Sequence, residues 1–197
     1  MSQLRYLYQS TALPRRRTGL LCAALVSVVL FGVLGYLYAG PILAEYPASL
    51  STPDSVAGMP RLTDGRFQDV SDQMTASIRT ESGADRPMVA SYAPVGMTSQ
   101  ALMVSAGTRL LLDPSAAVRE VFAGFGSRDG LVVTGVTSMP PGRLGGVVRC
   151  GEMWADAPLA VCVWGDHGSL GVVLGFGRTV PETADLLRTV RPLVLHR

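Results

Sequence analysis

The chain has 197 residues, 48% of them hydrophobic, and a formal net charge of +2. The positive charge comes from residues 1–17, which hold four arginines and no acid, whereas residues 45–197 hold 13 arginines against 15 acidic residues. A mildly acidic main part excludes nucleic-acid binding driven by bulk charge, so nucleic acid is not an expected partner.

An apolar stretch follows the basic tail. Residues 20–39 contain nothing more polar than Ser27 and two tyrosines, and about 20 helical residues span the hydrocarbon core of a bilayer. Arg15–Arg17 at the near end predict a cytoplasmic N-terminus. We therefore predict a cytoplasmic tail (1–17), a transmembrane helix (18–39), a linker (40–57) and an extracytoplasmic domain (58–197). A cleaved signal peptide is the alternative, and it would also leave the domain outside the cytoplasm.

Three helices are predicted in the outer part from apolar periodicity and end signals. Their signals are an apolar stripe from Phe67 to Ile78 ended by Gly83, an Asp113-Pro114 start with Gly126 as terminal glycine, and a Thr179–Glu182 capping box with Pro192 ending the last helix.

Six strands are predicted between these helices, at 88–92, 101–106, 131–137, 147–153, 159–165 and 170–174. The strand at 159–165 is apolar on both faces, which is typical of a central strand covered on both sides. The fold class is therefore α+β: an N-terminal transmembrane helix, then an antiparallel sheet with helices packed on it in a helix–sheet sandwich.

Two cysteines fall on adjacent predicted strands. A hairpin centred on Asp156 places Cys150 opposite Cys162, within reach of a disulfide. A structural cross-link is the favoured interpretation, and a redox-active pair is the alternative, although the C-x-x-C spacing is missing. No metal site is expected, because nothing near this pair completes a set of four ligands.

A polar turn between two strands offers the one candidate for catalysis. Asp166, His167 and Ser169 lie within four residues, but neighbours in a tight turn project in different directions, whereas a triad needs a line of hydrogen bonds from Asp to His to Ser. A hairpin turn with Asp166 bonding its own backbone is the favoured interpretation.

Four further residues are candidates for contact with a ligand or partner. Trp154 lies at the edge of a predicted loop, where an aromatic side chain is well placed to bind a partner. Arg143, Arg149 and Arg178 form an anion site if they meet at one edge of the sheet, but in a chain without lysine scattered surface arginines are the default.

The sequence around the two cysteines resembles that of a known group of proteins. Residues 145–150 and the Cys-x-Trp-x-Asp pattern within residues 161–172 resemble segments of uncharacterised membrane-anchored proteins of actinobacteria. That resemblance implies an anchored outer domain and brings no activity with it. The order of elements also resembles the PsbP-like fold, an antiparallel sheet between helices, which says little about function.

These observations favour a single-pass protein of the cell membrane whose extracellular domain binds an envelope protein or a small ligand, with no cofactor. An envelope hydrolase that uses the turn at Asp166, His167 and Ser169 is the alternative. A purely structural part of a larger membrane assembly is a third hypothesis.

Overall fold

The structure, a computed structural model, describes residues 15–82, 84–127, 132–154 and 158–197. It divides into two units, one ending at Pro41 and the other spanning Ile42–Arg197. The first unit contains most of α1 (Arg15–Glu45), which from Gly19 onwards is long and apolar enough to cross a membrane. A helix of this length and composition at the predicted position supports membrane anchoring.

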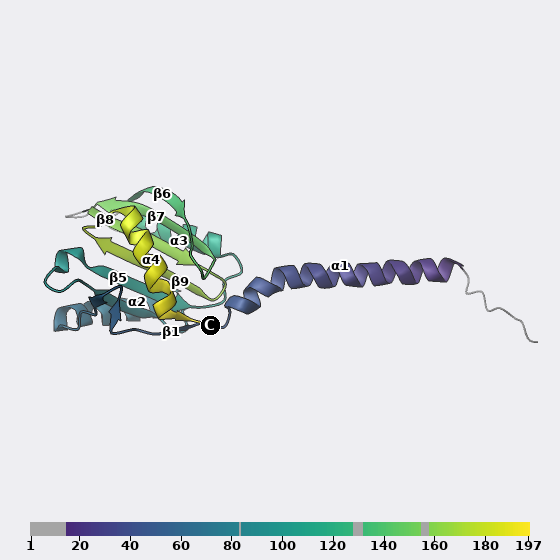
Figure 1. Cartoon of the computed structure of the whole chain (residues 1–197), viewed down its shortest axis with the longest axis horizontal. Helices are drawn as coiled ribbons and strands as arrows, with labels where there is room; N and C mark the ends of the chain where they lie inside the picture. The colour runs from purple at the N-terminus through teal and green to yellow at the C-terminus, as the bar shows by residue number, and fades with distance from the viewer. Residues whose placement is uncertain (1–14, 83, 128–131, 155–157) are drawn as a thin grey trace, which may run out of the picture. The chain divides into compact units, whose positions relative to one another are not determined.

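The second unit is built on a six-stranded antiparallel sheet with the strand order β4-β5-β9-β8-β7-β6 (Figure 1). The strands are β4 (Met88–Tyr92), β5 (Leu102–Thr108), β6 (Val133–Met139), β7 (Val147–Trp154), β8 (Pro158–Gly165) and β9 (Ser169–Phe176). The helices are α2 (Gly65–Ser82), η1 (Thr98–Gln100), α3 (Pro114–Ser127) and α4 (Val180–Val194). The predicted α+β class is confirmed.

The segment predicted as a linker at 40–57 is structured instead. Helix α1 continues to Glu45, and the chain then forms β1 (Ser49–Leu50), which pairs with β10 (Leu195–His196). A small hairpin follows, made by β2 (Ser55–Val56) and β3 (Met59–Pro60). Val56 is only 1% exposed, so burial of its side chain fixes this segment against the domain and the linker prediction is wrong.

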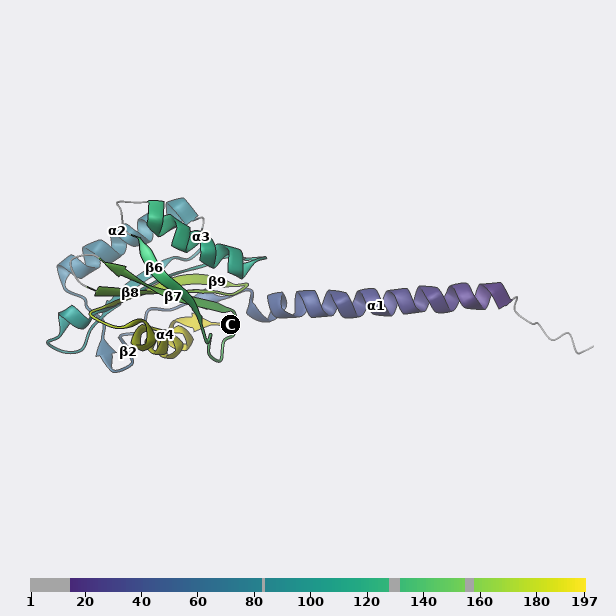
Figure 2. The same ribbon diagram turned by 90° about the horizontal axis from the view of Figure 1, so that it is seen from above.

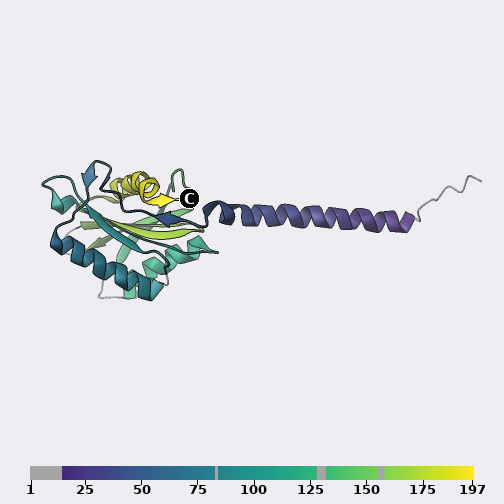
Figure 3. The same cartoon turned by 90° about the horizontal axis from the view of Figure 1, so that it is seen from below.

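The two faces of the sheet are covered differently. Helix α4 lies along one face, and α2 and α3 lie on the other, as the views from above and below show (Figures 2 and 3). We call the face under α4 the closed face, because its side chains form a continuous buried core. That core includes Leu102, Val104, Val148, Trp164, Val173 and Leu187. It also includes Val56 of β2, which is buried.

The other face is covered less completely. Helix α2 packs on β4, at one edge of the sheet, and α3 packs mainly on β7 and β8. Between the two helices the side chains of β9 that point to this side are only partly buried. These side chains are Leu170, Val172, Leu174 and Phe176. We call this side the open face.

Strand β8 lies near the middle of the sheet and is buried on both faces, as predicted. Ala160, Cys162 and Trp164 point to the closed face, while Val161 and Val163 point to the open face. The Trp164 indole lies across Gly171 of β9, where an added Cβ would be only 2.1 Å from the ring. A glycine is required at that place because the ring occupies the space of a side chain.

Two predicted helix ends are wrong. Helix α3 continues through Gly126, since glycine adopts helical angles as well as left-handed ones. Helix α4 continues through Pro192 to Val194. The proline lies in the last turn, where it removes one helical hydrogen bond, and the backbone N–H of Leu195 still reaches the carbonyl of Arg191. Buried Val194 holds this turn on the core.

Candidate functional site

The predicted disulfide is confirmed. Cys150 on β7 and Cys162 on β8 are directly opposed in the strand register, and their sulfur atoms are bonded. Both residues are fully buried in the core of the closed face. The tip of the hairpin that joins the strands, including Asp156, lies outside the described residues.

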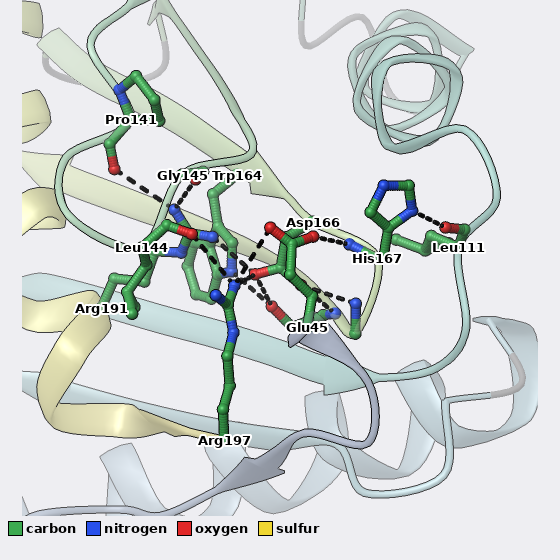
Figure 4. Close-up of polar contacts among 12 residues, drawn as sticks. Glu45, Leu111, Pro141, Leu144, Gly145, Trp164, Asp166, His167, Arg191 and Arg197 are labelled. Carbon is green, nitrogen blue, oxygen red and sulfur yellow. Dashed lines mark hydrogen bonds and ion pairs between the residues drawn. The ribbon is translucent and has the colours of Figure 1, made fainter. Parts of the chain in front are cut away.

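Asp166 is the centre of a buried polar cluster at the turn between β8 and β9 (Figure 4). Its side chain is 0% exposed. Oδ1 accepts hydrogen bonds from the backbone N–H groups of Gly168 at 2.8 Å and Ser169 at 2.7 Å. Oδ2 accepts from the Ser169 hydroxyl at 2.9 Å, from Arg191 Nη2 at 2.6 Å and from Arg197 Nη2 at 2.9 Å. The carboxylate is therefore saturated with donors.

The two arginines of the cluster are held by backbone carbonyls as well. Arg191 projects from α4, its side chain is 1% exposed, and its Nη1 donates to the Gly145 carbonyl at 2.7 Å. Arg197, near the C-terminus, donates to the Leu144 carbonyl at 3.2 Å. These bonds pair donors that a buried ion pair would otherwise leave unsatisfied. Arg191 Nε is buried and has no hydrogen-bond partner in the described part of the chain.

The ionisation of Asp166 follows from these contacts. Burial alone raises the pKa of a carboxyl group, because the charged form loses its hydration. Here the hydrogen bonds from Arg191, from the Gly168 backbone and from the Ser169 hydroxyl, with the charge of Arg191, outweigh that effect and lower the pKa of Asp166. The cluster is thus built around a charged aspartate.

His167 is turned away from that carboxylate (Figure 4). Its Nδ1 lies 2.7 Å from the carbonyl oxygen of Leu111, so this nitrogen carries the proton. Its backbone N–H donates to Glu45 Oε2 at 2.7 Å. Ser169 donates its hydroxyl proton to Asp166 and accepts a hydrogen bond from the Trp164 indole at 3.2 Å. The three candidates are close together, but these bonds do not form the Asp–His–Ser line that acyl transfer needs.

Glu45 brings the end of α1 to the same cluster. Besides accepting from His167, its carboxylate lies 3.7 Å from Arg197 Nη2. The backbone is equally close, because a Cβ added at Gly168 would be 2.0 Å from the Glu45 carbonyl oxygen. The cluster therefore joins four parts of the second unit: the end of α1, the β8–β9 turn, α4 and the C-terminus.

Sequence reasoning missed three of these residues. Arg191 had a signal, since it falls in the apolar stripe of α4 with Leu187, Val190 and Val194, and a charged side chain in a buried stripe needs a partner. Glu45 and Arg197 had no such signal. They lie at opposite ends of the second unit in sequence, and no local pattern connects residues so far apart.

The four predicted contact residues do not form one site. Trp154, whose side chain is 69% exposed, lines a pocket of about 260 Å³ together with Arg178. Arg143 precedes β7, whereas Trp154 is the last residue of β7, so these two lie toward opposite ends of the strand. Arg149 lies between them, opposite Val163 of β8. Arg178 donates to the carbonyl of Gln100 at 2.9 Å, so the three arginines do not converge.

The open face carries a different kind of site, which we call the α2–α3 groove. Its two pockets are lined on the sheet side by Met103, Ser105 and Gly107 of β5 and by Leu170, Val172 and Phe176 of β9. A proximal pocket of about 160 Å³ lies over Gly107 and Leu170, with Ile78 of α2 and Val121 of α3 on its two sides. A distal pocket of about 480 Å³ lies over Met103 and Phe176 and includes Phe67 of α2.

Within the described residues, no group of three or more metal-ligating side chains comes together. Comparison of the chain with models of protein families, with curated proteins and with solved structures finds no match in any of the three.

Proposed function

We propose that the protein is a single-pass membrane protein whose N-terminus is cytoplasmic and whose second unit is a binding module outside the cytoplasm. Three observations support this assignment. Helix α1 has from Gly19 onwards the length and composition of a membrane span. Arginines 15–17 are its first residues and lie ahead of that span, as the positive-inside rule requires of a cytoplasmic flank. The Cys150–Cys162 disulfide is typical of an oxidising compartment.

The α2–α3 groove is the observation that supports a binding function over a catalytic one. The polar groups that suggested catalysis are committed to structure, since the Ser169 hydroxyl proton goes to Asp166 and His167 bonds to Leu111. The groove, by contrast, leaves the apolar side chains of β9 partly exposed. Concave apolar surfaces with a few polar groups are the usual form of ligand sites.

The Asp166 cluster gives the module a fixed attachment point. Glu45, the last residue of α1, accepts a hydrogen bond from the backbone N–H of His167 at 2.7 Å. Both residues belong to the second unit, so the segment that follows the apolar run is bonded directly to the β8–β9 turn.

A fusion experiment tests the orientation. β-Lactamase joined through a flexible linker to Arg197 of the full chain is expected to make a host bacterium resistant to ampicillin, because the enzyme then lies outside the cytoplasm. The same enzyme joined to the N-terminal tail is the control and should give no resistance. Resistance from the N-terminal fusion alone would reverse the proposed orientation. In the exported protein, mass spectrometry should find the thiol hydrogens of Cys150 and Cys162 missing.

A further inference from the structure

The lining of the α2–α3 groove limits what it can bind. The side chains that line its two pockets are mainly aliphatic and aromatic, and Arg109 of the proximal pocket is the one charged residue among the described residues that line them. The two pockets share no described lining residue, but the row of partly buried side chains from Leu170 to Phe176 runs between them along β9, over about 20 Å at the rise of a strand. An empty cavity of ~150 Å³ accepts a benzene ring, so even the proximal pocket holds a segment of several carbons. The shape suits a long, thin apolar group.

The proximal pocket lies at the end of the sheet where the chain arrives from the membrane helix. Gly107 and Leu170, which line it, are paired across β5 and β9, and the next pair leads into the turn at Gly168. The backbone N–H of Arg109 donates to the Gly168 carbonyl at 3.3 Å, and Gly168 packs directly on the backbone of Glu45. The proximal end of the groove therefore lies close to Glu45, the last residue of α1.

The distal pocket differs in chemistry. The Ser91 side chain is 2% exposed, and its hydroxyl has no hydrogen-bond partner in the part of the chain that the structure describes. A buried hydroxyl without a partner is costly, and Ser91 is among the residues that line the distal pocket, with Thr98 and Gln100. No charged side chain is among the described residues lining that pocket. The pocket thus offers hydrogen bonds to an uncharged group.

We propose that the α2–α3 groove binds a single-chain membrane lipid, with its acyl chain along β9 and its uncharged, hydrogen-bonding head group at Ser91. The apolar floor supplies the driving force, which is about 0.8 kcal/mol for each CH₂ group removed from water. The unpartnered hydroxyl fixes the position of the head group. This inference rests on the proposed function, because it requires the module to stand beside a bilayer.

Photolabelling of the full-length protein tests the site. The protein is reconstituted into phosphatidylcholine vesicles that contain a few per cent of a monoacylglycerol with a diazirine in its acyl chain. After irradiation, mass spectrometry should find the label on peptides of β5, β9 or α3. Ser105→Trp fills the floor of the proximal pocket and should reduce labelling about tenfold, equivalent to ~1.4 kcal/mol.

Ser138→Trp is the matched control, because it places the same side chain on an exposed position of β6 and should leave labelling unchanged. Both variants must keep the disulfide and the melting temperature of the parent. A fatty acid with the same diazirine but a charged head group should label the groove less than the monoacylglycerol does.

Three outcomes would overturn the proposal: equal labelling of the parent and Ser105→Trp, label confined to α1, or a protein–protein cross-link through the groove that shows a second copy of the chain as its occupant. The β-lactamase test remains separate. Vesicles contain the protein in both orientations, so a wrong orientation in cells does not prevent labelling, and absence of labelling does not change the orientation.

Discussion

The two faces of the sheet are made from the same strands but are packed in opposite ways. On β9, Val173 points to the closed face and is fully buried, while its neighbour Val172 points to the open face and is only partly buried. Helix α4 covers the closed face along its length, and the disulfide and Trp164 belong to the same core. The open face has two helices that leave a groove between them.

This difference suggests that the two faces have different roles, one in stability and the other in ligand binding. The closed face carries the features that fix the fold: a continuous core, a covalent cross-link and a buried ion pair. The open face leaves part of its apolar surface exposed, and that is the surface that the proposed ligand would cover. Substitutions on the two faces should therefore differ in kind, with stability lost on one side and ligand binding lost on the other.

The largest expected loss of stability comes from breaking the ion pair under the closed face. Arg191→Met removes the main partner of Asp166 and leaves a buried charge with fewer donors, which costs about 3–5 kcal/mol of the free energy of unfolding. Urea titration of the full-length protein in lipid nanodiscs, followed by tryptophan fluorescence, measures the loss.

Arg188→Met is the control for that variant, since it lies on the same helix but pairs with Asp185 at the surface. Exposed pairs contribute at most about 1 kcal/mol. Equal losses for the two variants would show that the buried cluster has no special role in stability.

The same ion pair predicts a dependence on pH. Because its hydrogen bonds lower the pKa of Asp166 below that of the unfolded chain, its contribution is fully present above the unfolded pKa of about 4 and is lost as pH falls through the folded pKa. The gap in unfolding free energy between the parent and Asp166→Asn should be constant above about pH 5 and narrow below about pH 4. Measurements of both proteins from pH 3 to 7 check this, and a gap that widens in acid contradicts it.

The disulfide should contribute less than the ion pair. It closes a loop across 12 residues of sequence, for which restriction of the unfolded chain predicts about 2–3 kcal/mol. The double variant Cys150→Ala/Cys162→Ala should then melt roughly 5–10 °C below the parent. Cys22→Ala changes the cysteine outside this domain and should melt as the parent does. A drop of less than about 2 °C would mean that the strands hold their register without the bond.

Local patterns predicted most of the sheet and little of the site. Strand β8 was recognisable from its two apolar faces, and the capping box of Thr179 and Glu182 is present at the start of α4. The spacing of Cys150 and Cys162 predicted their pairing across a hairpin. In each case the signal lies within a few residues, or at most one hairpin, of the structure it predicts.

Features that depend on distant parts of the chain were missed. Strand β1 lies in the segment predicted as linker, because its partner, β10, is at the other end of the domain and no local pattern indicates the pairing. Glu45 reaches Arg197 for the same reason, and no local pattern announces that contact. The α2–α3 groove depends on how far apart α2 and α3 pack on the sheet. That spacing is set by side chains from four elements and has no signature in any one of them.

The smallest expected difference in unfolding free energy is between two variants of β9, and it compares the two faces most directly. Val173→Ala and Val172→Ala delete the same two methyl groups from neighbouring residues of β9. On the closed face the deletion leaves a cavity in a full core and should cost about 2 kcal/mol. On the open face part of the lost surface was already in contact with water, so the cost should be below about 1 kcal/mol.

Urea titrations of the two variants measure both losses, and monoacylglycerol labelling of the same samples then separates stability from binding. Val172→Ala should change the labelling, because Val172 lines the proximal pocket, whereas Val173→Ala should not while the protein remains folded. If both variants lose the same stability and neither affects labelling, the open face is packed as fully as the closed one and the groove is no ligand site. If Val173→Ala loses stability without a change in labelling and Val172→Ala changes labelling with little loss of stability, then the incomplete burial over β9 is the feature that makes room for a ligand.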